Sequence, residues 1–141
     1  MYSLPNELTL DALRKYSSYL FSRINESGSL TFKQVEIDGQ LSLARNCHEN
    51  TRGFLKSNSS HKIIYGWIFE KSESKLEHIE FFAHSVIQDP DGYLFDITPI
   101  QSNKPVMFLA ANLNDNDFAD IVNELEKLAG TATLIYHNAF K

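Results

Sequence analysis

The sequence predicts an α+β domain in which helices pack on an antiparallel sheet. Segments 10–25 and 115–128 carry apolar residues at spacings of three and four, which is typical of one buried helix face. Segments 61–71 and 76–89 are rich in β-branched and aromatic residues and predict strands. The Pro-Asp-Gly run at 90–92 is a strong turn signal, so the second of these strands is expected to fold back as a hairpin.

The first predicted helix covers residues 10–25. Four of its apolar residues share one face: Leu13, Tyr16, Leu20 and Ile24. Thr9 can cap its start, and Asp11 complements the positive end of the helix dipole. Residues 30–37 alternate imperfectly between apolar and polar and predict a strand or an extended arm, followed by a turn at 38–40.

A second helix is predicted from about Leu43 or Asn46 to Lys56. One of its faces is expected to hold Cys47, Asn50 or Thr51, and Phe54. Strands are predicted after this helix at 61–71, 76–89, 93–100 and 106–111, with a turn at 72–75. Asp115 or Asn116 is expected to cap the last helix, which runs through Leu128 and is ended by Gly130, and segment 131–140 predicts a closing strand.

Length and composition predict one domain over residues 1–141, because a chain of this size with 43% hydrophobic residues can bury a core without disulfides. The single cysteine cannot form an intramolecular disulfide. No apolar run is long enough to cross a bilayer, and the first residues lack the basic start and apolar middle of a signal peptide. We therefore expect a cytoplasmic protein, or one exported without a cleavable signal.

Charge argues against nucleic acid as a partner. The formal net charge is −5 and the basic residues are scattered rather than gathered on one face. The sequence holds no motif for a dinucleotide, a P-loop nucleotide or a serine nucleophile, so no cofactor is expected. We expect a protein or a small amide or thioester as the partner and no membrane association, and nothing in the sequence indicates an oligomeric state.

Cys47 is the candidate nucleophile because it lies near the predicted start of the second helix. A thiol attacks as its thiolate, so its pKa must fall below the ordinary value of about 8.5. Unpaired N–H groups at a helix start favour the anion, and a nearby histidine can accept the proton. His84 and Asp96, on the two predicted strands that flank the Pro-Asp-Gly turn, are the candidates for that histidine and for the group that orients it.

Strand register decides whether these two residues meet. If the turn centres on residues 90 and 91, His84 faces Ile97 and Asp96 is one place off. A bulge or a three-residue turn would instead set His84 opposite Asp96 on the same face. Asp96 lies among apolar residues, where an unpaired carboxylate is costly. A purely structural network, with Asp96 capping the turn at Thr98–Pro99, explains it as well as a thiol-activating one does.

The ordered set resembles the papain-like and transglutaminase-like thiol enzymes. It consists of Cys47 at a helix start, the Gly66–Trp67 pair in a strand, the Ala-His-Ser-Val run at 83–86, and the Tyr-Leu-Phe-Asp-Ile-Thr-Pro run at 93–99. The resemblance spans roughly residues 40 to 100. It implies a core in which a small antiparallel sheet packs on the cysteine helix. It also implies acyl transfer, with a Cys47 nucleophile, a His84 base and an orienting Asp96.

The neighbouring residues carry weaker expectations. Gln40 and Asn46, with the nucleophile's own backbone N–H, are candidates to bind the oxyanion, although Gln40 lies further upstream than the corresponding glutamine of papain-like proteases. Asn50 lies one helical turn later and can touch the substrate or face solvent. Trp67 can line a cleft or belong to the core. His48 should point about 100° away from the cysteine, so we expect it on the surface or supporting the site.

The sequence therefore predicts a cysteine-nucleophile acyl-transfer enzyme of the amidase, deamidase, peptidase or acyltransferase type. The alternative is a non-catalytic module of the same fold that binds a protein partner through its acidic surface or a cleft near Trp67. Close contact between Cys47 and a histidine separates the two. A metal site is not expected, because the candidate ligands Cys47, His84 and Asp96 include no close pair such as CxxC or HExxH.

Overall fold

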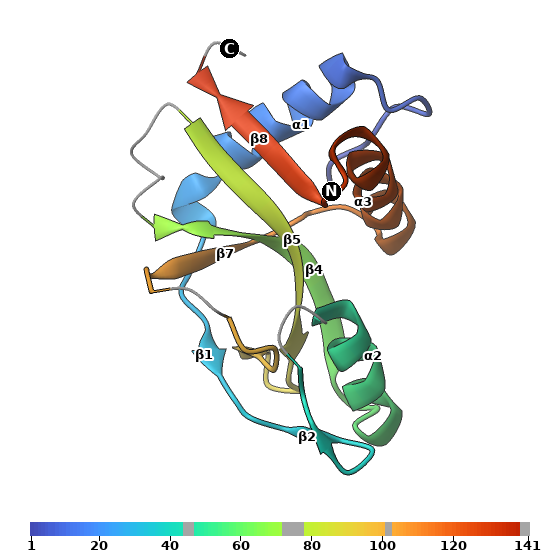
Figure 1. Cartoon of the computed structure of the whole chain (residues 1–141), viewed down its shortest axis with the longest axis vertical. Coiled ribbons are helices and arrows are strands. Elements are labelled where there is room, and N and C mark those ends of the chain that lie inside the picture. Colours follow the sequence, from blue (N-terminus) through green and yellow to red (C-terminus); the bar gives the residue numbers. More distant parts are fainter. Residues whose placement is uncertain (44–46, 72–77, 101–102, 139–141) are drawn as a thin grey trace.

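The computed structural model of the chain describes residues 1–43, 47–71, 78–100 and 103–138 (Figure 1). Its elements, in chain order, are α1 (Leu10–Ser22), the short 3₁₀ helix η1 (Ile24–Glu26), β1 (Thr31–Phe32), β2 (Glu36–Ile37), β3 (Gln40–Leu41), α2 (Cys47–Ser57), β4 (Lys62–Glu70), β5 (His78–Gln88), β6 (Leu94–Asp96), β7 (Val106–Ala110), α3 (Asp115–Ala129) and β8 (Thr133–His137). The α+β class predicted from the sequence is confirmed.

The main sheet is mixed but mostly antiparallel. Its strands run in the order β1-β6-β5-β4-β7, and β8 pairs with β5 beside this path. Only the short β1–β6 pair is parallel among the strand pairs of the described residues. The β2–β3 hairpin forms a small sheet of its own around Asp38 and Gly39, both of which have positive φ. The turn predicted at 38–40 is thus where the sequence indicated.

Strand β5 organises the sheet because it pairs along both edges. Residues 82–88 pair with β4 on one edge. On the other edge, residues 78–82 pair with β8 and residues 87–88 with β6. Within the described parts of the chain, no strand pairs with this second edge at residues 84–86. The unpaired stretch includes His84.

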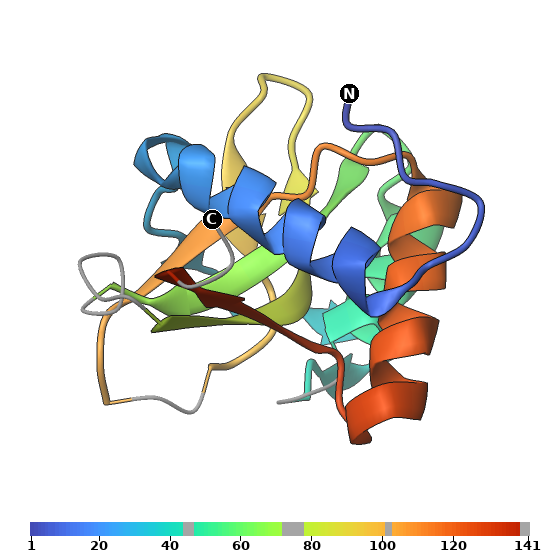
Figure 2. The ribbon, with the colours of Figure 1, turned by 90° about the horizontal axis from the view of Figure 1, so that it is seen from above.

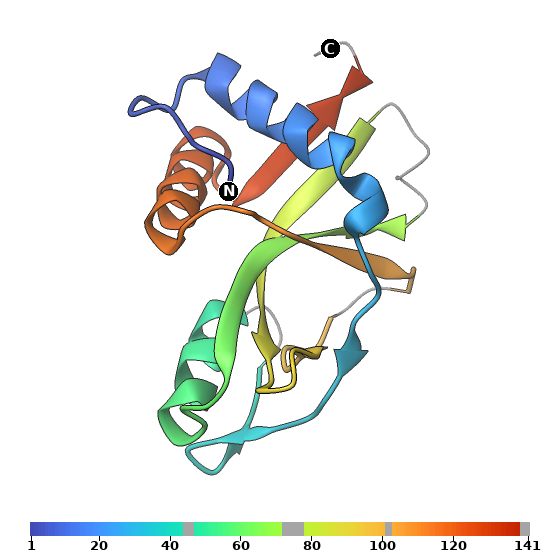
Figure 3. The ribbon, with the colours of Figure 1, turned by 180° about the vertical axis from the view of Figure 1, so that it is seen from behind.

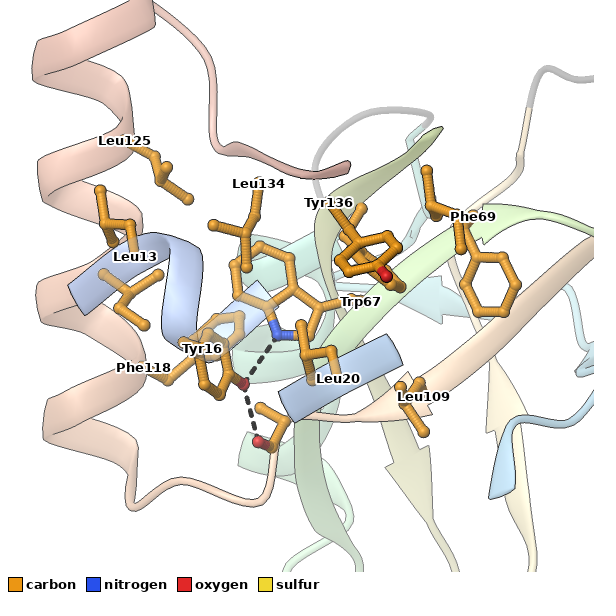
Figure 4. Packing of buried hydrophobic residues seen from close by; sticks show 14 residues of the cluster. Leu13, Tyr16, Leu20, Trp67, Phe69, Leu109, Phe118, Leu125, Leu134 and Tyr136 are labelled. Atoms are coloured by element: carbon orange, nitrogen blue, oxygen red, sulfur yellow. Dashed lines mark hydrogen bonds between the residues drawn. The ribbon is translucent and has the colours of Figure 1, made fainter. Parts of the chain in front are cut away.

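The larger core lies between the sheet and the helices α1 and α3. Figure 3 shows α1 crossing β8 and β5, and Figure 2 shows α3 beside it. Trp67 is fully buried at the centre, and its Nε1–H donates to the Tyr16 hydroxyl at 3.0 Å (Figure 4). That hydroxyl donates in turn to the Ala111 carbonyl at 2.7 Å. The apolar helix face predicted for residues 10–25 therefore packs as expected, although α1 itself ends at Ser22.

A second, smaller core holds α2 in place. Its fully buried residues include Ile87 from β5 and Ile97 just after β6, with Phe95 between the strands and α2. Phe54 and Leu55 of α2 pack against them, together with Ile37 of the hairpin. This cluster fixes the helix that begins with Cys47 against the hairpin formed by β5 and β6.

Two predicted strands are shorter than expected. Residues 30–37 form two separate two-residue strands rather than one. The strand predicted over 93–100 pairs only over Leu94–Asp96, because the Thr98 N–H donates to Asp96 Oδ1 at 3.0 Å and Pro99 has no N–H to offer a neighbouring strand. The turn predicted at 72–75 lies outside the described residues.

Candidate functional site

Cys47 is the first residue of α2, so its own backbone N–H has no partner within the helix. The helix begins at the later of the two starts that the sequence predicted. Glu49 in its first turn and Lys56 in its last turn both complement the helix dipole. The thiol is partly exposed, and it is the free cysteine of the chain.

His84 and Asp96 meet because of the turn that separates their strands. The Asp89 N–H donates to the Tyr93 carbonyl at 2.9 Å, which leaves a three-residue loop of Pro90, Asp91 and Gly92. Gly92 has a φ of 93°, a conformation that favours glycine. Asp89 Oδ1 accepts from the N–H groups of residues 91 and 93 and closes the loop. The three-residue turn that the sequence left open is therefore present.

The observed register corrects the expected one. Ile87 faces Phe95 and Gln88 faces Leu94, so a turn centred on residues 90 and 91 is wrong. In this register Asp96 falls opposite Val86, two residues from His84. Residues two apart share a face of a strand, so His84 and Asp96 are diagonal rather than direct neighbours. The prediction that they share a face holds, whereas a directly opposed pair does not form.

The carboxylate of Asp96 is fully used. Its Oδ2 lies 2.8 Å from His84 Nε2, and its Oδ1 accepts from the Thr98 N–H at 3.0 Å. The side chains of Asp96 and His84 are 2% and 4% exposed, so this pair is closed to solvent. The same carboxylate therefore caps the turn and binds the histidine. With Nε2 committed to Asp96, Nδ1 is the ring nitrogen left to meet the thiol.

The environment of Cys47 favours its anion. Burial raises the pKa of the thiol, but hydrogen bonds to the His48 and His84 rings, together with their charge, outweigh burial and lower the pKa from 9.0 to about 6. The His84 ring is also hydrogen-bonded to the buried Asp96 carboxylate, which favours its protonated form. A thiolate at neutral pH is the form that attacks carbonyl carbon.

The pKa of His84 is shifted upward, in the opposite direction to that of Cys47. Burial lowers the pKa of His84, but the hydrogen bond to Asp96, followed by the contact with Cys47 and the charges of both groups, raises it from 6.5 to about 9. Between about pH 6 and pH 9, Cys47 and His84 thus form a thiolate–imidazolium pair. Such a pair supplies a nucleophile and a proton donor side by side.

Asn50 holds the helix to the loop after β6. Its Nδ2 donates to Thr98 Oγ1 at 2.9 Å and to the Leu43 carbonyl at 2.8 Å. The side chain is 6% exposed, with its amide taken up by these contacts. The prediction that Asn50 contacts substrate is therefore not supported. Its contact with Thr98, which itself binds Asp96, links the cysteine helix to the carboxylate instead.

His48 is closer to the thiol than the sequence predicted. Its Nδ1 lies 2.9 Å from Ser85 Oγ, which also contacts Thr51 Oγ1 at 3.0 Å, and its ring still reaches Cys47. Successive residues of a strand point to opposite faces, so the first turn of α2 meets His84 on one face of β5 and Ser85 on the other. The two adjacent side chains can both approach the site because side chains of a first helical turn lean back past the helix start. Ser85 and Thr51 were not identified from the sequence.

The other predicted site residues lie elsewhere. Gln40 is exposed in the β2–β3 hairpin, which packs on α2 near Gly53 through Ile37 and lies away from the helix start (Figure 1). The strand that carries it pairs back on β2, so this placement lends its oxyanion role no support, and that role stays a prediction. Trp67 is buried in the main core and lines no cleft among the described residues. Asn46 lies outside the described residues.

An open cleft adjoins Cys47. It has a volume of about 380 Å³, and its lining consists of Cys47, Ile68, Phe82, Ala83, His84, Thr98, Pro99 and Ile100. A larger hollow of about 580 Å³ runs along residues 2–15 and shares none of these residues. In the part of the chain that the structure describes, no group of three or more His, Cys, Asp or Glu side chains is arranged to hold a metal ion. Within the same ranges, no helix is both long and apolar enough to span a membrane.

Comparison with known proteins returned no match: no protein family, no curated protein and no solved structure is similar to this chain. The site is accordingly interpreted from its own geometry.

Proposed function

We propose that this protein is a cysteine-nucleophile enzyme that transfers or hydrolyses acyl groups, with Cys47, His84 and Asp96 as its catalytic triad. The observation that carries the proposal is the contact of a helix-start thiol with a buried histidine whose far nitrogen lies 2.8 Å from a buried carboxylate. A non-catalytic module has no need for this arrangement, which orients the ring and shifts both pKa values toward the ion pair.

The order and placement of the three residues support a papain-like or transglutaminase-like enzyme. Cys47 begins a helix, His84 lies on a strand packed against that helix, and Asp96 lies on the next strand of the same hairpin. Asn50, which joins the helix to the loop after Asp96, keeps the two halves of this arrangement in register. This order supports the proposal of the core that the sequence resemblance implies.

The proposed reaction begins from the ion pair. The Cys47 thiolate attacks a carbonyl carbon, and a C–S bond forms as the carbonyl π electrons move onto oxygen. The oxyanion collapses, the bond to the leaving group breaks, and protonated His84 gives its proton to the departing nitrogen, oxygen or sulfur. The acyl group then remains on Cys47 as a thioester.

When the acyl group is released, His84 acts as a base instead of an acid. Neutral His84 takes a proton from water or an amine as that nucleophile attacks the thioester carbon. The C–S bond breaks, the product departs, and the thiolate–imidazolium pair is restored. Asp96 keeps its hydrogen bond to Nε2 throughout, which holds Nδ1 toward the reacting atoms. The N–H of Cys47, which has no partner within α2, is the group proposed to bind the oxyanion.

The proposal is tested by trapping the acyl-enzyme. Purified protein is mixed with 4-nitrophenyl acetate at pH 6.5, and intact mass and nitrophenolate release are followed over time. We expect one acetyl group on Cys47 and a rate constant about 10² times that of N-acetylcysteine, because the enzyme thiol is mostly ionised at this pH and an ordinary thiol is about 1% ionised.

The matched control is Cys47→Ala, which removes the chain's sole thiol and should leave no rapid acetylation. Acetylation of the wild-type protein no faster than that of N-acetylcysteine would contradict the proposal. An equally fast burst in Cys47→Ala would do the same, since it would place the reaction on another group.

A further inference from the structure

The cleft beside Cys47 is apolar apart from the reacting groups. Among the described residues, its lining besides Cys47 and His84 includes one polar side chain, Thr98, and no charged one. Thr98 is 3% exposed, its hydroxyl accepts from Asn50 Nδ2 and its N–H donates to Asp96, so it offers a ligand little polar surface. The remaining lining is hydrocarbon or aromatic, which favours an apolar group over a charged or sugar-like one.

A second hollow extends this apolar surface. It has a volume of about 150 Å³ and shares Ile68, Thr98 and Ile100 with the cleft at Cys47. Its other lining residues are Leu30, Phe32, Asp96 and Val106. Asp96 is 2% exposed and each of its carboxylate oxygens is hydrogen-bonded, so it adds little polar surface here. The apolar surface therefore runs from the thiol past Ile68 and Ile100 toward β1 and β7.

The rim of this surface carries two exposed aromatic rings. Phe82 on β5 is 41% exposed and Phe32 on β1 is 45% exposed, one in each hollow. When a hydrocarbon covers such exposed apolar surface, the surface leaves water and the free energy of binding improves by about 25 cal/mol per Å². Both rings lie where a chain attached to a carbonyl at Cys47 would pass.

We propose that this surface binds the acyl part of the substrate, and that the acyl part is a hydrocarbon chain or an aromatic group joined directly to the carbonyl that Cys47 attacks. This inference rests on the proposed function and narrows its substrate class to thioesters, esters or amides of apolar acids. The leaving group is not constrained by the cleft, because the acyl chain fills it.

The test uses a series of acyl thioesters of N-acetylcysteamine with two, four, six, eight and ten acyl carbons. The rate constant for acylation of Cys47 is measured for each by intact mass. We expect the rate constant to rise about fourfold for each added methylene, as expected for full burial of each group, and then to level off when the surface is filled. N-acetylcysteine is acylated in parallel to correct for the intrinsic reactivity of each thioester.

Two variants locate the effect. Phe82→Asp should reduce the ratio of the octanoyl to the acetyl rate constant at least tenfold. Phe32→Asp should reduce the ratio of the decanoyl to the acetyl rate constant. Ile135→Asp is the matched control: Ile135 is 44% exposed on a strand but lines neither hollow, so the ratio should be retained. Both Phe positions are partly exposed, and either variant alone is sufficient for the comparison if the other fails to fold.

The outcomes separate the two proposals. Rapid acetylation of Cys47 with no gain for longer chains would overturn the acyl-chain assignment while the proposed chemistry stands. The acyl-chain assignment would also be overturned if the rate constant rose with chain length as steeply in both folded Phe variants as in the wild-type protein. If no thioester of any length acylates Cys47 faster than N-acetylcysteine, the proposed function fails and the acyl-chain assignment fails with it.

Discussion

Replacing His84 with glutamine is expected to slow acetylation of Cys47 by 4-nitrophenyl acetate at pH 7 by about one to two orders of magnitude. The reason is loss of thiolate, since removing the His84 charge and hydrogen bond returns the thiol pKa toward its ordinary value. Glutamine is the informative replacement because its amide N–H can still donate to Asp96 Oδ2. Alanine would leave a buried carboxylate without that partner, a change that by itself threatens folding.

The leaving group separates the two roles of His84. Nitrophenolate departs without a proton, so the variant should recover most of its ester rate when the pH is raised to 9.5 and the thiol ionises. The anilide nitrogen must be protonated as it leaves. With a 4-nitroanilide, the acylation rate constant of the variant should therefore fall about 10² to 10⁴ times further than with the ester, and it should not recover at high pH. The matched control is His78→Gln, because His78 is half exposed and far along β5 from the site. Equal losses for ester and anilide at pH 8.5, where His84 of the wild-type protein is still mostly protonated, would contradict a proton-donating role.

Replacing Gly66 with alanine is expected to destabilise the protein by about 3 kcal/mol. A Cβ at this position would overlap the Leu109 carbonyl oxygen and lie 2.6 Å from Phe108 Cζ. The oxygen belongs to the backbone of the neighbouring strand β7, so no rotamer change relieves the overlap, and β4 and β7 must separate. Gly66 of β4 is also the direct partner of His84 on β5, so a shift of β4 would displace the strand that carries the histidine.

Gly28→Ala is the matched control for this substitution. Gly28 bridges to Phe108, the same residue that Gly66 would strike, but no heavy atom lies within 4 Å of a Cβ built there. We expect its free energy of unfolding in urea to stay within about 1 kcal/mol of the wild type. If both variants lost the same stability, the close approach of β7 to Gly66 would not be the cause.

Local signals accounted for much of the fold. The helix-spaced apolar residues of α1 and α3 and the left-handed Gly130 after α3 are short-range features that sequence patterns report directly. The N-cap of α3 is Asn114, one residue before the earlier of the two predicted caps. The pairing of β8 with β5 and of β1 with β6 joins residues far apart in sequence, and no local pattern specifies such partners. The same limit explains why residues 30–37 were expected to form one strand.

The identity of the candidate site residues was predictable from the sequence, but the way they are brought together was not. Cys47, His84 and Asp96 stood out because each is a reactive or polar residue at a defined place in an otherwise regular element. The register was not predictable, because it depends on whether Asp89 closes a two- or a three-residue turn, and the side-chain bonds of Asp89 decide that. The sequence left Trp67 open between the core and a cleft wall and could not locate Gln40, because both positions depend on how the core and the hairpin pack.

The pH dependence of Cys47 alkylation by iodoacetamide tests the central claim most directly. The chain has one cysteine, so every adduct reports on this thiol. The account predicts a rate that titrates with a pKa near 6 in the wild-type protein, shifts upward by a unit or more in His84→Gln, and is unchanged in His78→Gln. A wild-type thiol that titrates near its ordinary pKa of about 8.5 and is indifferent to His84 would contradict the claim that Cys47 is an activated nucleophile.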